Sequence, residues 1–270
     1  MTSFLSGGVA VVTGAGSGIG RALAQQLSAA GSALAIADID ENGLSETSAS
    51  LSGKQAAVST HVLDVSDEAA VRSFADDVVA RHGRVTLLIN NAGVALIGTF
   101  EEISLDDLRW LMGINFWGVV YGVKYFLPIL KQQPRAHIVN LSSVFGIVAP
   151  VGQSAYSASK FAVRGFSEAI RHELEGTSVF VSSVHPGGIH TPIAKRALLG
   201  AHCPPNKKDE AVAFFEQVTP TSPETAAARI LKGVENREPR ILIGSDARKI
   251  DIVQRLRPAT YWKVMAKRAQ

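Results

Sequence analysis

Short runs of β-branched and aliphatic residues alternate with longer amphipathic segments along most of this 270-residue chain. Several of the short runs are apolar throughout, which is typical of strands buried on both faces of a parallel sheet. Strands of this kind that alternate with helices predict one parallel sheet with helices packed on both of its faces. We therefore expect an α/β fold, a doubly wound parallel sheet of about seven strands.

The expected elements follow from length, from β-branched content and from helix-capping residues. Strands are predicted over residues 9–12, 34–37, 57–63, 87–89, 137–141, 179–184 and 240–243. Helices are predicted to begin near Ile19, Asp40, Asp67, Leu105, Tyr156 and Pro223. Acidic residues follow Ser66, Ser104 and Ser222, so these three serines are candidate N-caps.

No linker rich in proline, glycine or serine divides the chain, so we expect a single domain over residues 1–244 and an extension over residues 245–270. Residues 192–223 contain five prolines and mixed charge, which favours a lid over a site. The composition, 46% hydrophobic and 19% charged, is that of a globular protein. Cys203 is the single cysteine, and we find neither a secretory signal nor a transmembrane segment, so a cytoplasmic protein is expected.

The positive charge is concentrated at the end of the chain. Residues 229–270 carry 11 Lys and Arg against 4 Asp and Glu, or +7, which leaves −4 for the rest of a chain whose net charge is +3. No nucleic-acid-binding motif accompanies this charge, so nucleic acid is not an expected partner. The basic and aromatic residues of the extension suit weak contact with an anionic membrane surface. Pro258 interrupts the extension, however, which favours packing on a neighbouring subunit or on the lid.

A glycine-rich segment follows the first expected strand and runs directly into a helix. Its residues are Thr13, Gly14, Ala15, Gly16, Ser17, Gly18, Ile19 and Gly20. Glycines let a ligand approach the backbone closely, and the free N–H groups of a helix start attract a diphosphate. A tight turn that binds nothing is the alternative. Asp38 ends the second strand, where it either accepts hydrogen bonds from an adenosine ribose and repels the extra phosphate of NADP, or caps the next helix.

Tyr156 and Lys160 are spaced four residues apart on an expected helix and therefore share one of its faces. A cation beside a phenol favours the phenolate, so we expect Lys160 to lower the pKa of Tyr156 from about 10 toward working pH. Such a pair on its own is common on helix surfaces. Here Ser143 ends a strand thirteen residues upstream and Asn115 lies within an earlier helix, which favours a catalytic group.

With these motifs in order, the chain from about residue 8 to 244 resembles the short-chain dehydrogenase/reductase family, whose fold is Rossmann-type. The segment 13–20 matches its T-G-x-x-x-G-x-G pattern, residues 90–93 its N-N-A-G motif and residues 186–191 its P-G-x-I-x-T segment. The resemblance implies a catalytic tetrad of Asn115, Ser143, Tyr156 and Lys160. It also implies NAD as cofactor, with NADP disfavoured by Asp38 and by a serine at position 17. From the glycine-rich segment, the implied cofactor residues are Thr13, Gly14, Gly16, Ser17, Gly18, Ile19 and Gly20. Elsewhere they are Asp38, Asp64, Val65, Asn91, Ala92, Gly93, Tyr156, Lys160, Pro186, Gly187, Ile189 and Thr191.

The resemblance further implies a mechanism. Ser143 would bind the substrate oxygen and the Tyr156 phenolate would take its proton, while Lys160 would hold the cofactor ribose and Asn115 would anchor a water. The expected reaction interconverts a secondary alcohol and its ketone. The rivals are an NADP(H)-dependent carbonyl or ketoacyl reductase and a regulator that binds NAD(H) without turnover.

The substrate walls are expected in residues 94–97, 144–151 and 193–215, which are mostly apolar and suit a hydrophobic alcohol or ketone. Among them we assign Phe145, Val151 and Leu198 to the substrate, together with Ser143 and Tyr156; Lys195 or Arg196 would be needed to hold a carboxylate.

Three other features have plain interpretations. His185 and His190 lack the further ligands of a metal site, so no metal is expected. Trp110, Phe116 and Trp117 are expected in the core. Small residues on the Tyr156 helix, among them Ala158 and Gly165, predict a homodimer or homotetramer or, alternatively, close packing on the chain's own sheet.

Overall fold

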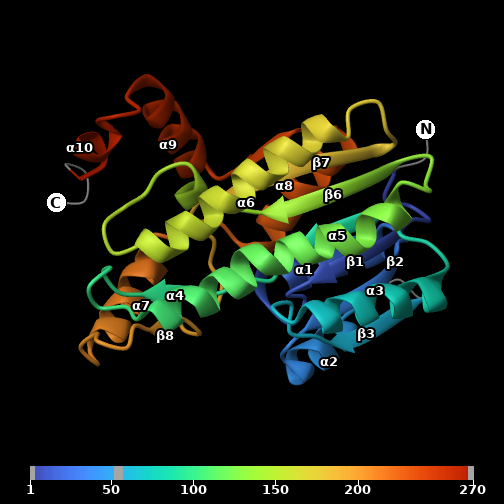
Figure 1. The fold of residues 1–270 in the computed structure, drawn as a ribbon, viewed down its shortest axis with the longest axis horizontal. Coiled ribbons are helices and arrows are strands. Elements are labelled where there is room, and N and C mark those ends of the chain that lie inside the picture. The colour runs from blue at the N-terminus through green and yellow to red at the C-terminus, as the bar shows by residue number, and fades with distance from the viewer. Residues whose placement is uncertain (1–3, 52–56, 267–270) are drawn as a thin grey trace.

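The computed structural model describes residues 4–51 and 57–266, and the last four residues of the extension lie outside that range. Its main sheet is parallel throughout, in the order β3-β2-β1-β4-β6-β7-β9 (Figure 1). The strands are β1 (Val9–Thr13), β2 (Ala33–Asp38), β3 (Val58–Val62), β4 (Leu87–Asn90), β6 (Ala136–Leu141), β7 (Val179–Pro186) and β9 (Arg240–Ile243). The predicted doubly wound α/β fold is confirmed, and the strand order reverses between β1 and β4, where ligands of such sheets bind.

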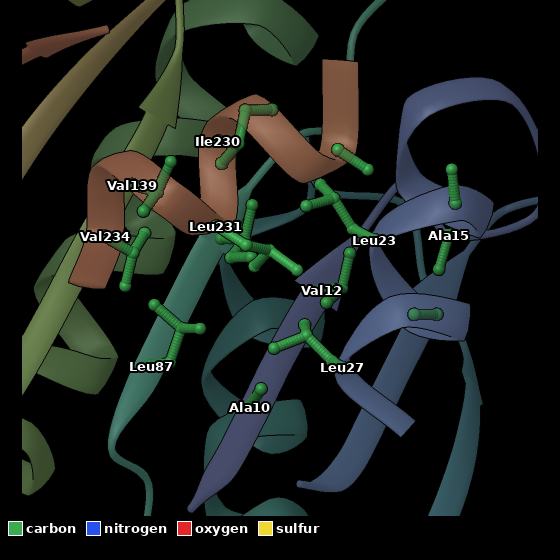
Figure 2. Close-up of a cluster of buried hydrophobic side chains, with 14 of the residues drawn as sticks. Ala10, Val12, Ala15, Leu23, Leu27, Leu87, Val139, Ile230, Leu231 and Val234 are labelled. Carbon is green, nitrogen blue, oxygen red and sulfur yellow. The ribbon is translucent and has the colours of Figure 1, made fainter. Parts of the chain in front are cut away.

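Helices cover both faces of the sheet. On one face, α1 (Gly18–Ala29) and α8 (Pro223–Glu235) pack on β1, β4 and β6 through fully buried aliphatic side chains such as Leu23, Leu27 and Ile230 (Figure 2). The helix α2 (Glu41–Ala49) adds Leu44 to this cluster. On the opposite face lie α3 (Glu68–His82), α5 (Gly118–Leu130) and α6 (Ser154–Glu173) (Figure 1).

Two of the three predicted serine caps are present. Ser104 forms a reciprocal capping box with Asp107 at the start of α4 (Leu105–Met112), and Ser222 accepts a hydrogen bond from the backbone of Thr225. The prediction for Ser66 was wrong. The helix α3 begins one residue later than expected, so that the carboxylate of Asp67 is the cap.

The helix predicted from Leu105 is divided by a π-helical turn over Gly113–Trp117. This turn brings Asn115 into full burial, while Trp110 and Trp117 remain 37% and 47% exposed. The expectation that both tryptophans are core residues was therefore wrong. A π-helical turn adds a residue to the helix and rotates the following side chains, which the apolar pattern alone does not reveal.

Elements that the sequence did not predict gather at the carboxyl ends of the strands. The segment expected as a lid contains β8 (Leu198–Leu199), which pairs with β5 (Leu96–Ile97), and α7 (Lys207–Gln217). The extension folds into α9 (Ser245–Leu256) and α10 (Tyr261–Ala266), beyond β9 (Figure 1). Within the described residues, no helix combines the length and the apolar character needed to cross a bilayer.

Candidate active site

A cavity of about 940 Å³ opens at the carboxyl edge of the sheet. Its walls come from the segments that follow β1, β2, β3, β4, β6 and β7, from the lid segment and from α9. Most of the predicted cofactor residues line it, namely Gly14, Ser17, Gly18, Ile19, Asp38, Asp64, Val65, Asn91, Ala92, Gly93, Tyr156, Lys160, Pro186, Gly187, Ile189 and Thr191. The other three, Thr13, Gly16 and Gly20, belong to the glycine-rich turn but are not on the cavity wall.

The glycine-rich turn is bound to the end of β4. The Thr13 hydroxyl accepts hydrogen bonds from the backbone N–H groups of Asn91 and Ala92, both at 3.1 Å. The Asn91 amide donates in return to the carbonyl oxygens of Thr13 and Gly14. A Cβ at Gly20 would lie 2.0 Å from the Gly14 oxygen, so this position admits only glycine. These contacts fix the floor of the cavity between β1 and β4.

The start of α1 faces the cavity with its backbone donors free of a cap. Ser17 occupies the N-cap position but makes no capping hydrogen bond, and the first turn carries no acidic residue. An uncapped helix start with its partial positive charge suits a diphosphate. Asp38 braces the same turn, because its carboxylate accepts hydrogen bonds from the backbone N–H groups of Gly16 at 2.8 Å and Asp40 at 3.0 Å. Asp40, rather than Asp38, caps α2.

Two more predicted residues continue this half of the cavity. Asp64 follows β3 and accepts hydrogen bonds from the backbone and the hydroxyl of Ser66, which fixes the carboxylate at the cavity wall. Val65 next to it packs against Gly118 at the start of α5. This half of the cavity thus has both polar groups and an apolar side wall.

Ser143 and Tyr156 bring their hydroxyl groups together in the other half. Ser143 follows β6, and its Oγ accepts a hydrogen bond from the Phe145 backbone at 3.1 Å. Burial raises the pKa of Tyr156 to about 12, and the neighbouring Ser143 hydroxyl opposes that rise. The expectation that the pKa of this phenol is lowered is therefore wrong for the protein without a ligand, because loss of hydration outweighs the effect of Lys160.

Lys160 is buried behind Tyr156 on α6. Its Nζ donates to the Leu141 carbonyl oxygen at 3.1 Å and lies 5.6 Å from the centre of the Tyr156 ring. Burial lowers the pKa of the Lys160 ammonium to about 8. Gly93 leaves room for this group, since a Cβ there would lie 3.4 Å from Nζ and 3.1 Å from Oδ1 of Asn115.

Both polar atoms of the Asn115 side chain have protein partners. It accepts from the Val94 backbone N–H at 2.8 Å and donates to the Val94 carbonyl oxygen at 3.0 Å and to Ser159 at 3.2 Å. Asn115 is not on the cavity wall. It therefore ties the segment after β4 to α6, the helix that carries Tyr156 and Lys160.

The segment after β7 is held by a residue that the sequence did not indicate. Asp246, in the first turn of α9, accepts a hydrogen bond from the Gly188 backbone at 2.7 Å and lines the cavity. Thr191, three residues on, lies against Gly18 of the glycine-rich turn. An acidic residue in a helix first turn is too common to have marked Asp246 as part of a site.

His185 and His190 have partners other than a metal. His185 is fully buried, and its Nδ1 donates to the Ser143 carbonyl oxygen at 2.9 Å, while burial lowers its pKa to about 4. His190 Nδ1 lies 3.5 Å from the Thr219 hydroxyl. No three metal-ligating side chains converge anywhere in residues 4–51 and 57–266.

The substrate half of the cavity is apolar. Of the residues assigned to substrate, Ser143, Phe145, Val151 and Tyr156 line it. Leu198 does not and is a correction: it lies in β8, opposite Leu96 of β5, and its side chain is 38% exposed. The sequence missed Trp110, Gln153, Val218 and Ile250, which also line the cavity. They come from four separate elements, so no single stretch of sequence could have grouped them.

Comparisons with known proteins agree with this fold. The family model for short chain dehydrogenases matches residues 8–200. SadH of Mycobacterium tuberculosis is 42% identical over 268 residues, which cover 98% of this chain and 96% of SadH. A short chain dehydrogenase/reductase from Burkholderia phymatum, solved in complex with NAD, superposes with a TM-score of 0.87 at 33% identity and covers 94% of this chain and 95% of its own. A Mycobacterium paratuberculosis short chain dehydrogenase bound to NAD gives a TM-score of 0.77 at 29% identity, with 88% and 97% coverage.

The fold and these comparisons therefore define an α/β oxidoreductase. The chain belongs to the short-chain dehydrogenase/reductase family.

Proposed function

We propose that this protein is an NAD(H)-dependent oxidoreductase that interconverts a hydrophobic secondary alcohol and its ketone. One observation carries the proposal. The paired hydroxyls of Ser143 and Tyr156 open into the same cavity as the glycine-rich turn and Asp38, so one cavity has a reaction end and a dinucleotide end.

The residues present suit a nicotinamide dinucleotide. The uncapped start of α1 would hold the diphosphate, Asp38 the adenosine ribose, and Ile189 and Thr191 the nicotinamide amide. NAD is preferred to NADP because Asp38 is an anion where NADP carries an extra phosphate. The NAD held by two similar solved structures supports the same choice. When bound, this cofactor accepts or donates the hydride, chemistry that no side chain supplies.

The side chains then manage the proton of the substrate hydroxyl. Ser143 binds the substrate oxygen and orients it toward Tyr156. Tyr156 takes the proton as general base in the oxidising direction and returns it in the reverse direction. Its pKa of about 12 must fall for this role, and a protonated Lys160 behind the ring provides the nearest positive charge. Asn115 maintains this arrangement by holding the Val94 backbone.

The cavity favours an uncharged, apolar substrate. Phe145, Val151, Phe214 and Phe215 line it beside Tyr156. Lys195, a candidate for holding a carboxylate, pairs with Glu216 at 2.9 Å and is not on the wall. Arg196, the other candidate, lines the cavity at the end where it contacts Asp40, so a carboxylate among these apolar residues would lose its hydration without that cation, which is costly.

Replacement of Tyr156 by Phe tests the reaction. We expect Tyr156→Phe to lower kcat with NAD⁺ and apolar secondary alcohols by at least about a hundredfold, since a positioned general base contributes on that order. NADH affinity, measured by fluorescence titration, should change little. Tyr125→Phe is the matched control, because its hydroxyl donates to Glu68 and Tyr125 is not on the cavity wall. Full turnover by Tyr156→Phe would refute the mechanism, and NADH binding without any turnover across an alcohol panel would favour a regulator.

We also propose that the protein self-associates through α6. The helix exposes Ala158, Phe161, Gly165 and Ala169 along one side, and Phe161 is 40% exposed. Trp117, 47% exposed, stacks on Tyr121 and extends an apolar surface from the neighbouring helix. Small residues let two helices approach closely. Light scattering should give a dimer or tetramer, and Gly165→Arg should give a monomer.

The C-terminal extension lies next to the reaction end of the cavity. The Ala149 backbone donates to the Tyr261 hydroxyl at 3.0 Å, and Ile250 reaches the cavity wall. These contacts support packing on the chain itself as the role of the extension, in preference to the membrane contact that its basic residues also allow.

A further inference from the structure

Two adjacent cations of the lid segment point in different directions. Lys195 pairs with Glu216 on α7, within the lid segment itself. Arg196 instead crosses to the dinucleotide end of the cavity, where its guanidinium lies 3.1 Å from the Asp40 carboxylate and 3.5 Å from the Ser17 hydroxyl. Arg196 lines the cavity together with Ser17 and Asp38. Arg196 thus places a positive charge beside the glycine-rich turn, whose own residues 13–20 include no Lys or Arg.

Arg196 lies near Asp38, the residue expected to hold an adenosine ribose. An acid at the end of the second strand holds the ribose 2′-oxygen in folds of this kind, and Asp38 has that position. The Asp38 carboxylate accepts hydrogen bonds from the backbones of Gly16 and Asp40. Ser17, which follows Gly16, and Asp40 therefore lie on either side of it. The guanidinium of Arg196 contacts both flanking residues, so it would lie close to a ribose held by Asp38.

The other nearby cation is not available to a ligand. Arg21 is held beneath the turn by the Gly16 carbonyl oxygen at 2.6 Å, by Glu46 at 2.7 Å and by Thr47 at 3.0 Å. Arg196 is 55% exposed and has Asp40 as its single ionic partner in the part of the chain that the structure describes. Since an exposed ion pair is weak, Arg196 can exchange Asp40 for a phosphate at little cost.

We propose that Arg196 binds the 2′-phosphate of NADP(H), so that this protein accepts NADPH as well as NADH in spite of Asp38. An arginine holds a phosphate with charge-assisted hydrogen bonds, which are stronger than those between neutral groups. Asp38 still favours NADH, and Arg196 reduces the difference in affinity between NADH and NADPH. The inference rests on the dinucleotide site proposed above and concerns its choice between the two cofactors.

Binding measurements on Arg196→Met test the proposal without any substrate. The dissociation constants of NADH and NADPH are measured by fluorescence titration at one fixed ionic strength. Loss of one exposed charge-assisted contact should raise the NADPH constant about tenfold and leave the NADH constant within about twofold. Lys195→Met is the matched control, because it removes the adjacent lid cation from an ion pair that does not reach the cavity, and it should alter neither constant.

Asp40→Asn provides the converse test. Asparagine caps a helix as well as aspartate does, so α2 should persist while Arg196 loses its competing partner. NADPH should then bind more tightly, and most of this gain should vanish in the double variant with Arg196→Met. A gain that is undiminished in the double variant would contradict a role for Arg196.

Other outcomes would overturn the proposal. An equal loss of NADH and NADPH affinity in Arg196→Met would assign the guanidinium to the diphosphate or to lid closure. Unchanged affinity for both, or no measurable NADPH binding by the unaltered protein, would leave the Arg196–Asp40 pair as a surface contact. Failure of the unaltered protein to bind NADH as well would instead refute the proposed function itself.

Discussion

At the residue scale, burial decides the behaviour of the groups that the sequence brings together. The spacing of Tyr156 and Lys160 predicts that they share a helix face, and they do. The same spacing suggests a lowered phenol pKa, whereas burial raises it to about 12 and lowers that of Lys160 to about 8. Both shifts favour the neutral form, because a charge loses its hydration inside the protein.

Lys160→Met should therefore stabilise the fold while it abolishes turnover. The folded state binds the Lys160 proton less tightly than the unfolded chain does, so a protonated Lys160 costs stability at neutral pH. We expect the free energy of unfolding at pH 7 to rise by on the order of 1–3 kcal/mol in the variant. In the unaltered protein, that cost should disappear as the pH rises from about 8 toward 10.5. Urea unfolding at several pH values, with the exposed Lys124→Met as control, measures both effects, and a less stable variant would contradict them.

At the element scale, local sequence pattern predicts the strands of the main sheet and the helices that cover it. It does not predict the short elements around the cavity. The strand predicted over residues 240–243 agrees at both ends with β9, and the others differ by one or two residues at an end. The π-helical turn, β5, β8 and α7 were not predicted. They are short or are stabilised by contacts with distant segments, as β8 is by β5, so their own residues carry little signal.

The contact between α9 and the segment after β7 gives a prediction at this scale. Asp246→Ala removes the acceptor of the Gly188 N–H, a partly buried hydrogen bond to a charged group. Such a bond contributes about 1.5–3 kcal/mol, so the free energy of unfolding should fall by about that amount, and NADH should bind more weakly as the segment loosens. Chemical unfolding and NADH titration measure the two effects. Asp106→Ala is the control, since that carboxylate is 90% exposed, and an equal effect of both variants would contradict the prediction.

At the scale of the whole molecule, buried histidines couple the fold to pH. Burial lowers the pKa of His137 to about 3 and that of His185 to about 4. Unfolding restores a pKa near 6.5, so the unfolded chain binds more protons below that pH. Above pH 6.5 these histidines are neutral in both states and do not lower the free energy of unfolding. As the pH falls from 6.5 toward 4, that free energy decreases.

We expect each of these histidines to lower the free energy of unfolding by about 1.4 kcal/mol per pH unit below pH 6. Guanidinium unfolding at pH 7, 6 and 5 measures the slope in a range where most carboxylates remain ionised. His137→Gln should reduce the change in the free energy of unfolding per pH unit by the contribution of one histidine. This holds whatever the effect of the substitution on stability at pH 7. A stability that is constant from pH 7 to 5 would contradict this account.

Local sequence alone determined the doubly wound sheet, the glycine-rich turn after β1 and the order of Asn115, Ser143, Tyr156 and Lys160, because periodicity, glycine and capping residues act over a few neighbouring positions. Only the tertiary structure decided that Arg196 reaches Asp40, that Asp246 holds Gly188 and that Leu198 is not part of the cavity wall. These contacts join segments from 58 to 156 residues apart or depend on the pairing of two short strands. They form because the packed core fixes the orientation of the lid and the extension. The residues near each position in the sequence do not reveal that orientation.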